Sequence, residues 1–418
     1  MRILILSWEY PPVIVGGLGR HVHALSTALA RQGHDVTVVS RWADGAPLEE
    51  ILDGVHVLRA PTDPPSIPMN DLLAWTMALN HTLLRAALRA DLDTPDVVHA
   101  HDWLVAHAAT TLKEHFGVPL VTTLHATEAG RHQGWLPGPL NRAIHTVEWW
   151  LTYEARRVVT CSRSMAWEVT RLFELPPGKV DVIGNGTDLA AFRAPARSVA
   201  AARARYAGDG PLLVLPGRLE WEKGAHVALA AMPRLRRRHP GIRLVLAGAG
   251  TQEQALRDRT RQLRLGRCVT FAGRLPTDEL AALLGAADVT VAPSLYEPFG
   301  LVALESAVAG TPLVVSDTGG LAEFVDPGRT GLRVAQDDPA ALADGVSAML
   351  ADEVAAARMA RTARAAASGM DWNQVALATA AVFERAGREE RALQASTRAR
   401  PAPLRMLVRD GNLLADGR

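Results

Sequence analysis

The segment SLYEPFGLVALESAVAG, residues 294–310, decides the fold of this chain. A short apolar run at residues 289–293 precedes it and predicts a β-strand, whereas its second half has apolar residues at helical spacing. Pro298 and Gly300 predict a sharp turn from the strand to the helix. The N–H groups of Gly300 and Leu301 would point out of the positive end of the new helix. The turn therefore predicts a site for a phosphate or pyrophosphate.

Two carboxylates belong to this turn. Glu297 lies in the turn itself, and Glu305 lies in the helix, just over one helical turn beyond Leu301. A carboxylate repels phosphate but accepts hydrogen bonds, so the hydroxyl groups of a sugar or a ribose are partners that fit both. The alternative interpretation is a buried turn with two solvated glutamates, and the surrounding chain has to decide between the two.

Length and composition exclude several classes of protein. The chain has 418 residues, which predicts two to three domains, and its net charge of +1 gives no global attraction for nucleic acid. Cys161 and Cys268 are far apart and lack metal-ligand spacing, which suits a reducing cytosol. The first residues predict a strand and not a signal peptide, and no apolar run approaches the ~18 residues of a spanning helix. We therefore expect a soluble, cytoplasmic protein.

Apolar runs typical of strands alternate with amphipathic segments along most of the chain. These runs lie at residues 2–8, 36–40, 55–59, 96–101, 120–125, 158–162 and 180–184, and the pattern restarts at 212–216, 243–247, 269–272, 289–293 and 313–316. Such alternation predicts parallel sheets with helices on both faces. We therefore predict an α/β fold with two doubly wound, Rossmann-like domains that face each other across a ligand-binding cleft.

The same pattern predicts the domain boundaries. The first domain would span residues 1–190 and the second 191–370, with a linker near the Asn-Gly pair that begins at Asn185. Residues 371–391 predict a helix with one apolar side, which could cross back onto the first domain. Residues 392–418 are rich in Arg and Pro, and they predict a mostly disordered tail.

A glycine-rich loop, within SWEYPPVIVGGLG, follows the first strand. Gly16 and Gly17 would let backbone N–H groups approach an anion closely. The loop does not match the GxGxxG dinucleotide fingerprint, and an ordinary tight turn is the alternative interpretation.

Histidines and an aspartate end two neighbouring strands, in VVHAHDW and TTLHATEAG. His99 predicts a packed core histidine, whereas His101 and Asp102 emerge at the carboxyl end of their strand. Trp103 beside them offers an apolar face of the kind on which sugars stack. His125 would lie at the same edge of the sheet, so these side chains predict one site.

The segment GRLEWEKG follows the first strand of the second domain. Arg218 and Lys223 are five residues apart around a turn, so both could reach one pyrophosphate and neutralise it as a leaving group. Solvated surface charge is the alternative. Lys223 argues weakly against it, because the chain uses Arg at nearly every other basic position.

Together these five segments, in their order along the chain, resemble the retaining glycosyltransferases of family 4, which include glycogen and sucrose synthases. The resemblance covers residues 1–390 and implies the GT-B fold. SWEYPP, GGLGRHV, HAHDWLVAH and HATEAGRH look similar to actinobacterial enzymes that build α-1,4-linked glucose chains of glycogen or polymethylated glucose polysaccharides. The short chain and the sequence Glu297-Pro-Phe-Gly depart from the long ADP-glucose glycogen synthases, so the donor base, UDP, ADP or GDP, stays open.

The resemblance implies a role for each residue of the predicted site. The catalytic set is Asp102, His125, Arg218, Lys223 and Glu297. The donor-binding set is Gly16, Gly17, Asn185, Arg218, Lys223, Pro298, Phe299, Gly300, Leu301 and Glu305. The acceptor-side set is Trp8, Glu9, Tyr10, His101 and Trp103. Glu297 would hold the glucose hydroxyls and Glu305 the ribose diol.

No motif clearly supplies the nucleophilic carboxylate that a double displacement needs, so we expect front-face retention. In that mechanism the acceptor attacks from the side on which the nucleotide diphosphate leaves. Asp91-Leu92-Asp93 is formally a DxD, the metal signature of the other glycosyltransferase fold, but it falls in a predicted loop. We therefore expect no metal ligands, no essential metal and no cofactor.

Three alternatives remain open at this stage. The enzyme could transfer mannose from GDP-mannose, since sequence resolves sugar contacts poorly. It could act on lipid-linked acceptors at a membrane surface through a helix at residues 142–157, which carries Trp149, Trp150 and Leu151. It could also be a non-catalytic protein that binds sugar nucleotides or glycans.

Overall fold

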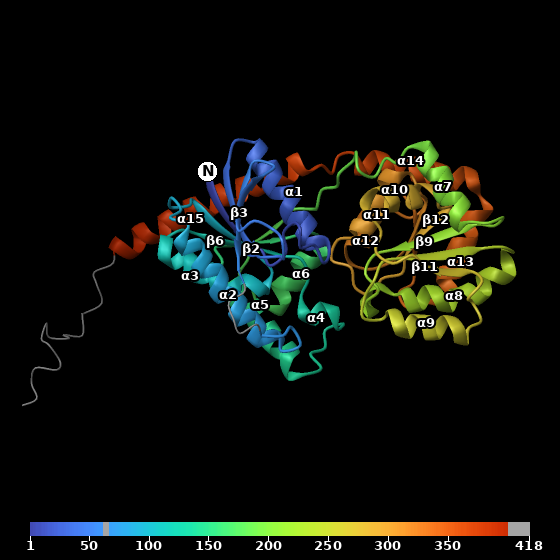
Figure 1. Cartoon of the computed structure of the whole chain (residues 1–418), viewed down its shortest axis with the longest axis horizontal. Helices are drawn as coiled ribbons and strands as arrows, with labels where there is room; N and C mark the ends of the chain where they lie inside the picture. Colours follow the sequence, from blue (N-terminus) through green and yellow to red (C-terminus); the bar gives the residue numbers. More distant parts are fainter. Residues whose placement is uncertain (62–66, 400–418) are drawn as a thin grey trace, which may run out of the picture.

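Two β-sheets organise the structure, a computed structural model that describes residues 1–61 and 67–399. Each sheet forms the centre of one domain, and the two domains lie side by side (Figure 1). Alternate residues of β1 show how the sheets are covered, because Leu4 and Leu6 belong to one apolar core, whereas Ile3 and Ile5 belong to another. Strands buried on both faces are typical of doubly wound domains, and the predicted fold class is confirmed.

Within the described residues, the first sheet has eight strands in the order β3-β4-β2-β1-β5-β6-β7-β8. All neighbouring pairs are parallel except β3 and β4. The strands are β1 (Arg2–Leu6), β2 (Asp35–Arg41), β3 (Glu49–Leu52), β4 (Val55–Ala60), β5 (Val97–His101), β6 (Leu120–Leu124), β7 (Arg157–Thr160) and β8 (Val180–Val182). The helices are α1 (Gly17–Arg31), α2 (Leu72–Arg89), η1 (Trp103–Val105), α3 (Ala106–Phe116), α4 (Glu128–Arg131), α5 (Pro139–Glu154) and α6 (Arg163–Leu172).

The second sheet has six parallel strands in this part of the chain, in the order β11-β10-β9-β12-β13-β14. They are β9 (Leu212–Pro216), β10 (Arg243–Ala247), β11 (Val269–Phe271), β12 (Val289–Ala292), β13 (Leu313–Ser316) and β14 (Leu332–Val334). The helices are α7 (Ala196–Tyr206), η2 (Trp221–Lys223), α8 (Ala225–Arg238), α9 (Glu253–Gln262), α10 (Thr277–Ala286), α11 (Leu301–Ala309), α12 (Gly319–Phe324), α13 (Pro339–Ala351) and α14 (Glu353–Ala367).

The strand order locates the ligand-binding edge of each sheet. β1 lies between β2 and β5, and β9 lies between β10 and β12, so the direction of strand addition reverses at these strands. In doubly wound sheets, ligands bind beyond the carboxyl ends of the strands at this switch point. The glycine-rich loop, the HAHDW segment, GRLEWEKG and the turn before α11 follow β1, β5, β9 and β12, respectively.

The helix α15 (Trp372–Ala399) crosses back from the second domain to the first (Figure 1). Its apolar residues Val375, Val382 and Phe383 join the core that contains Ile3 and Ile5 of β1. Thr187 N donates to Met370 O at 3.0 Å, so the two chain segments that connect the domains lie side by side.

The helix α15 also corrects the prediction of a disordered tail from residue 392 onward. It continues to Ala399, because contacts near its end hold it on the first domain. Arg156 donates to Glu390 at 2.7 Å, and Gln394 Nε2 donates to Gly117 O at 3.3 Å. The remainder of the predicted tail, residues 400–418, lies outside the described residues.

Strand β3 was missed in the sequence. It pairs antiparallel with β4, and Asp53 and Gly54 between them have positive φ angles of 52° and 83°. An Asp-Gly pair between two strands is typical of a tight hairpin turn, so the sequence did carry a signal for this strand.

Candidate active site

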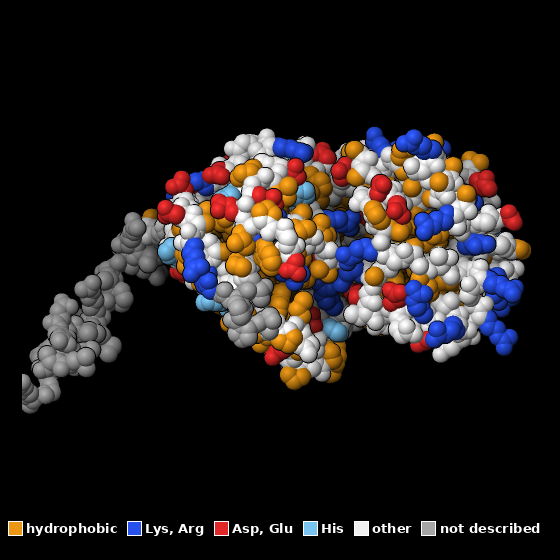
Figure 2. All heavy atoms as spheres, viewed as in Figure 1, with side chains coloured by type: hydrophobic (Ala, Val, Ile, Leu, Met, Phe, Trp, Pro, Cys, Tyr) orange, Lys and Arg blue, Asp and Glu red, His pale blue; other side chains and the backbone are white. Residues whose placement is uncertain are grey.

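The predicted functional segments meet where the two domains face each other. The glycine-rich loop belongs to the first domain, whereas Arg218 and the turn with Glu297 belong to the second. Figure 2 shows Lys and Arg side chains gathered along the boundary between the two lobes. Positive side chains on this boundary would attract an anionic ligand.

The glycine-rich loop lies against the predicted anion-binding turn. Gly300 has a φ of 97°, a left-handed conformation that favours glycine, and α11 begins at the next residue, Leu301. A Cβ atom on Gly17 would lie 3.0 Å from Leu301 Cδ1, and one on Gly16 would lie 3.9 Å from Arg218 Cδ. The first turns of α1 and α11 therefore lie side by side, one from each domain, next to a guanidinium group.

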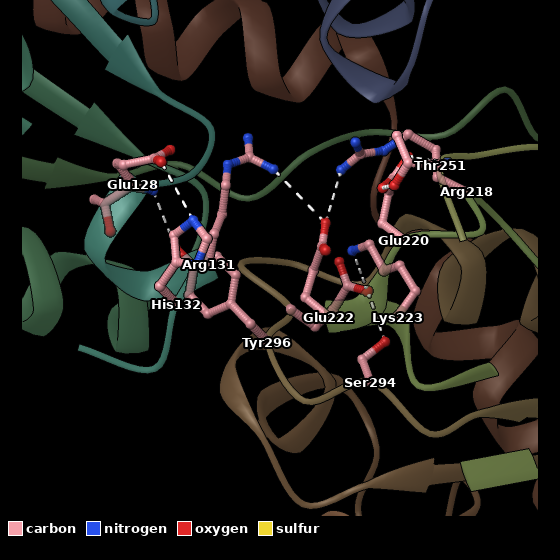
Figure 3. Close-up of polar contacts among 12 residues, drawn as sticks. Glu128, Arg131, His132, Arg218, Glu220, Glu222, Lys223, Thr251, Ser294 and Tyr296 are labelled. Atoms are coloured by element: carbon pink, nitrogen blue, oxygen red, sulfur yellow. Dashed lines mark hydrogen bonds and ion pairs between the residues drawn. The ribbon is translucent and has the colours of Figure 1, made fainter. Parts of the chain in front are cut away.

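Lys223 and Glu297 form an ion pair in the predicted donor site (Figure 3). Lys223 Nζ lies 2.9 Å from Glu297 Oε2, and Ser294 Oγ donates to the same oxygen at 3.2 Å. Gly224 explains why these segments lie so close together, because a Cβ atom there would lie 1.8 Å from Pro293 O. The backbone after Lys223 thus packs directly on the strand end that leads to Glu297.

Arg218 has a weaker partner. Its Nη2 lies 3.3 Å from Glu222 Oε1, and the same oxygen lies 3.8 Å from Nη1 of Arg131, which comes from the first domain (Figure 3). An ion pair with a half-exposed arginine contributes little stability. A pyrophosphate could therefore replace Glu222 as the partner of Arg218.

Glu305 pairs with a residue of the first domain. Arg20 Nη1 donates to Glu305 Oε1 at 2.6 Å. The carboxyl side chain is only 5% exposed, whereas the arginine is 41% exposed. Burial raises the pKa of Glu305, and Arg20 partly offsets this effect. The contact joins α1 and α11, so Glu305 links the two domains at the site predicted for the ribose.

Asp102 and His125 lie together at the ends of β5 and β6. His125 N donates to Asp102 Oδ1 at 2.7 Å, and Asp102 has an unusual φ of 60°. A left-handed aspartate stores backbone strain, and such residues cluster at functional sites. Burial raises the pKa of Asp102 to about 7, partly opposed by this hydrogen bond and by Arg131. Burial lowers the pKa of His125 to about 4, and Arg131 acts in the same direction.

Comparisons with known proteins agree with this geometry. The model described as Glycosyltransferase Family 4 matches residues 15–191, and Glycosyl transferases group 1 matches 201–366. The chain is 52% identical to a glycogen synthase of Mycobacterium tuberculosis over 94% of this chain and 96% of that protein. It is 32% identical to a D-inositol 3-phosphate glycosyltransferase of Acidothermus cellulolyticus, over 90% and 87%. The solved structure of a sucrose-phosphate synthase of Thermosynechococcus elongatus matches with a TM-score of 0.79 and 27% identity, over 95% of this chain and 100% of that one.

The chain belongs to the family 4 glycosyltransferases. The predicted family, the GT-B fold and the classification as a glycosyltransferase enzyme are confirmed.

The remaining donor-side residues of this glycosyltransferase lie between its domains. Ser162 Oγ of the first domain donates to Pro298 O at 2.6 Å, and Phe299 packs against apolar cores of both domains. Asn185 is buried and its Oδ1 lies 2.9 Å from His21 Nδ1. The structure thus brings these residues to the domain boundary, and their donor contacts stay predictions.

The predicted acceptor-side residues have different environments. Glu9 is buried, and its Oε2 accepts from Val15 N at 2.7 Å and from Gly16 N at 3.0 Å, so it shapes the glycine-rich loop. Tyr10 is 1% exposed and its hydroxyl lies 3.1 Å from Ser26 Oγ, which places its side chain in the core and not on an acceptor surface. Trp8 is half-buried against Trp75, Trp103 is half-buried in η1, and their acceptor contacts stay predictions.

His101 is also more buried than the sequence suggested. It is 0% exposed, and its Nδ1 lies 3.0 Å from His125 Nε2, so His101 lies behind His125 as seen from the site. A direct acceptor contact by His101 is therefore not supported by the geometry. His99 is a core residue, as predicted, with its Nε2 2.8 Å from Thr123 Oγ1.

Several residues of the glycosyltransferase site were missed in the sequence. They are Arg20, His21, Arg131, Glu222 and Tyr296. Arg20 and His21 belong to GGLGRHV, in the first turns of a helix whose start was predicted to face the ligand, so their positions could have indicated a role. Arg131 and Tyr296 belong to HATEAGRH and to the segment at residues 294–310, but the residues that they contact lie far away in sequence.

The DxD sequence Asp91-Leu92-Asp93 lies away from the site. Asp91 and Asp93 follow α2, and Asp93 Oδ2 lies 3.2 Å from Arg2 Nη1 at the amino end of β1. The site lies at the opposite, carboxyl ends of the strands.

The predicted membrane-surface helix corresponds to α5, and its apolar residues have mixed environments. Leu151 is buried and the ring of Trp150 lies 4.8 Å from that of His107 in a tilted arrangement, whereas Trp149 is exposed and stacks on Tyr153. One face of α5 is therefore packed against the first domain. Among the described residues, no helix combines the length and apolar character needed to cross a membrane.

Proposed function

We propose that this enzyme transfers glucose from a nucleotide diphosphate glucose to the non-reducing end of an α-1,4-glucan or related oligosaccharide, with retention of configuration. The observation that carries this proposal is the 52% identity to a glycogen synthase over nearly the whole chain. The site geometry supports it, because one arginine and one lysine for a pyrophosphate (Arg218 and Lys223) lie together at the domain boundary with two carboxylates for hydroxyl groups.

The proposed chemistry is a front-face displacement. The acceptor oxygen forms a bond to the anomeric carbon while the bond from that carbon to the phosphate oxygen breaks, and the departing phosphate oxygen takes the acceptor proton. Arg218, Lys223 and the N–H groups of Gly300 and Leu301 stabilise the charge that develops on the pyrophosphate. No residue has to supply a nucleophile in this route.

Asp102 and His125 are proposed to hold the reacting sugar. His125 is neutral at pH 7 because burial lowers its pKa to about 4. A neutral imidazole can hydrogen-bond a sugar hydroxyl without placing a second positive charge beside the oxocarbenium-like centre. An ionised Asp102 would stabilise that centre and would keep its hydrogen bond to His125 N.

The pH profile tests this role of Asp102. Its pKa is raised to about 7, and the active form is the ionised one, so the active fraction grows as the pH rises through 7. We therefore expect kcat/KM to fall about tenfold per pH unit below about pH 7, since kcat/KM reports groups of the free enzyme. Asp102→Asn should have low activity and no such acid limb. An unchanged limb in that variant would assign the titration to another group.

Metal removal tests the charge stabilisation by protein groups. We expect activity to persist in excess EDTA after the protein has been stripped of metal, because Arg218, Lys223 and the helix N–H groups neutralise the leaving group. Complete loss of activity that Mg²⁺ or Mn²⁺ restores would contradict this mechanism.

A donor and acceptor panel tests the proposed function as a whole. UDP-, ADP- and GDP-glucose and GDP-mannose should be offered with maltooligosaccharides, and the product linkage read by NMR. We expect α-1,4-linked glucose products with a UDP or ADP donor. Turnover with GDP-mannose alone would favour the mannosyltransferase. Specific binding of a donor without turnover on any of these acceptors would overturn the proposed acceptor. A cytoplasmic location stays a prediction.

A second candidate acceptor comes from the relatives at about one-third identity. They are D-inositol 3-phosphate glycosyltransferases, and one is 32% identical over 90% of this chain. D-Inositol 3-phosphate therefore belongs in the same acceptor panel, beside a lipid-linked acceptor for the membrane-surface alternative. Faster turnover on either compound than on maltooligosaccharides would replace the glucan as the proposed acceptor.

A further inference from the structure

Three histidines of the first domain converge beside the proposed sugar site. His21 comes from α1, His101 ends β5, and His125 follows β6. One ring nitrogen of each lies within 4.8 Å of those of the other two. The ring centres of His21 and His125 are 4.6 Å apart, and His101 Nδ1 lies 3.0 Å from His125 Nε2. Among the described residues, no other group of His, Cys, Asp or Glu side chains has this geometry.

Asn185 determines which nitrogen of His21 is available. His21 Nδ1 lies 2.9 Å from Asn185 Oδ1, and an amide oxygen only accepts, so Nδ1 carries the proton. Nε2 then carries a lone pair, and it is buried without a hydrogen-bond partner in the described part of the chain. An oxygen that accepts from the far N–H of a histidine is the usual arrangement for a metal-ligating imidazole.

His101 leaves a second ring nitrogen unsatisfied. His101 Nδ1 and His125 Nε2 share one proton, and His101 Nε2 is buried with no partner within residues 1–61 and 67–399. His101 Nε2 is therefore free to carry the ring proton of this histidine. If the shared proton moves to His101 Nε2, His101 Nδ1 and His125 Nε2 both carry lone pairs, and the protein loses no proton.

The rings are already in the protonation state that binds metal. Burial lowers the pKa of all three, to about 4 for His125, and the neighbouring rings lower those of His21 and His101 further. The positive charge of Arg131 also lowers the pKa of His125. Neutral imidazole is the form that ligates metals, so an ion does not have to displace protons at pH 7.

We propose that His21, His101 and His125 bind a divalent transition-metal ion of the zinc class. Three nitrogens about 2.1 Å from a tetrahedral ion lie about 3.4 Å apart, so the rings need to approach by little more than about 1 Å. An imidazole set suits zinc, cobalt, nickel or copper, whereas magnesium and calcium require oxygen ligands. His125 is half-buried and the other two are buried, so the ion enters from the His125 side and keeps its fourth position open there.

An ion at this position inhibits the enzyme, a step that rests on the proposed function. It adds positive charge beside a carbon that itself becomes positive in the transition state. The ion is therefore an inhibitor and not a cofactor, which is consistent with the expectation that activity persists in EDTA.

Metal binding to the stripped protein tests the site independently of catalysis. Co²⁺ should give the intense visible spectrum of a tetrahedral complex, and Zn²⁺ titrated in a calorimeter should bind with one ion per chain. His21→Gln should weaken binding at least about tenfold, because it removes a ligand. His107→Gln is the matched control, since His107 is half-buried outside the cluster and packs against Trp150. Circular dichroism should show folded protein in each case.

A second variant keeps the test valid if His21→Gln fails to fold. Asn185→Asp should tighten Zn²⁺ binding about tenfold, because a carboxylate behind His21 Nδ1 raises the basicity of the ligand. An octahedral cobalt spectrum overturns the proposal. Equal affinity of the wild type and the folded His21→Gln variant, or unchanged affinity in Asn185→Asp, also overturns it.

Measurements of Zn²⁺ inhibition test the effect of the metal site on glucosyl transfer separately from metal binding itself. Zn²⁺ should inhibit glucosyl transfer, EDTA should restore it, and His21→Gln should raise the inhibitory concentration by the same factor by which it weakens binding. Binding at the cluster without inhibition would support the metal site, overturn its inhibitory role and count against the placement of His125 at the sugar.

Discussion

Lys223→Ala and Arg218→Ala are each expected to lower kcat by about a hundredfold or more, the scale of losing one group that stabilises transition-state charge. Both side chains lie at the domain boundary beside the first turn of α11, and the departing pyrophosphate gains negative charge as the glycosidic bond breaks. Steady-state kinetics with the preferred donor measures the effect. A loss in kcat and kcat/KM together would show that the contact matters most in the transition state.

Charge-preserving variants provide the controls. Lys223→Arg and Arg218→Lys keep the positive charge and should retain more activity than the alanine variants, although neither swap is neutral. Arg238→Ala removes a surface cation that pairs with Asp344 in the second domain, and it should leave kcat unchanged. Near wild-type turnover in both alanine variants, with folding intact, would remove Arg218 and Lys223 from the site.

The Lys223–Glu297 contact adds a further expectation to this experiment. The two groups lie 2.9 Å apart, so Lys223→Ala also leaves the Glu297 carboxylate without its cation. Residues that act as one unit are not additive. The double variant Lys223→Ala/Glu297→Ala should therefore lose less activity than the product of the two single losses.

The fold and the position of the site could be predicted because both depend on local pattern and on simple topology. Apolar runs identify parallel strands, and polar residues directly after such a run must lie at the carboxyl edge of the sheet. Asp102 and Arg218 follow a strand in this way, Glu297 lies in the turn between β12 and α11, and the structure brings all three segments to the domain boundary.

Contacts across the domain boundary could not be predicted. Arg20 and Glu305 are 285 residues apart, and Arg131 reaches Glu222 from another domain, so these pairs depend on how two separately folded sheets are placed. Sequence periodicity describes one helix or strand at a time, so it does not indicate how the two sheets are placed relative to each other.

The direction of side chains near strand ends was also hard to predict. Tyr10 and His101 both border the site in sequence, yet each is at most 1% exposed. Tyr10 turns toward Ser26 and His101 toward His125, and both partners lie in other elements. Tyr10 lies beyond the end of β1, where the chain turns and the period-2 rule of a strand no longer applies. His101 is the last residue of β5, and the same rule places it on the face of the buried His99, with the two ring centres 4.2 Å apart.

The two glutamates around the α11 turn should differ in their effect on catalysis. Glu297 lies beside Lys223 at the mouth of the helix, and we place it at the glucose hydroxyls, so Glu297→Ala should act mainly on kcat. Glu305 lies deeper in the helix, at the proposed ribose position, so Glu305→Ala should raise the donor KM and weaken binding of the free nucleoside diphosphate. Loss of uniform donor binding raises KM alone, whereas loss of a transition-state contact lowers kcat.

Calorimetry with the nucleoside diphosphate decides between these roles, because this ligand has a ribose but no sugar. Arg20→Ala is the matched control, since it breaks the same 2.6 Å contact between the domains as Glu305→Ala but keeps the carboxylate. If Glu305 acts through the ribose, Arg20→Ala should retain nucleotide affinity and Glu305→Ala should lose it.

An equal loss in both variants would assign the effect to the domain contact. Weak binding in Glu297→Ala with normal binding in Glu305→Ala would reverse the two roles, and no effect of either on affinity or rate would reduce the segment at residues 294–310 to a structural turn.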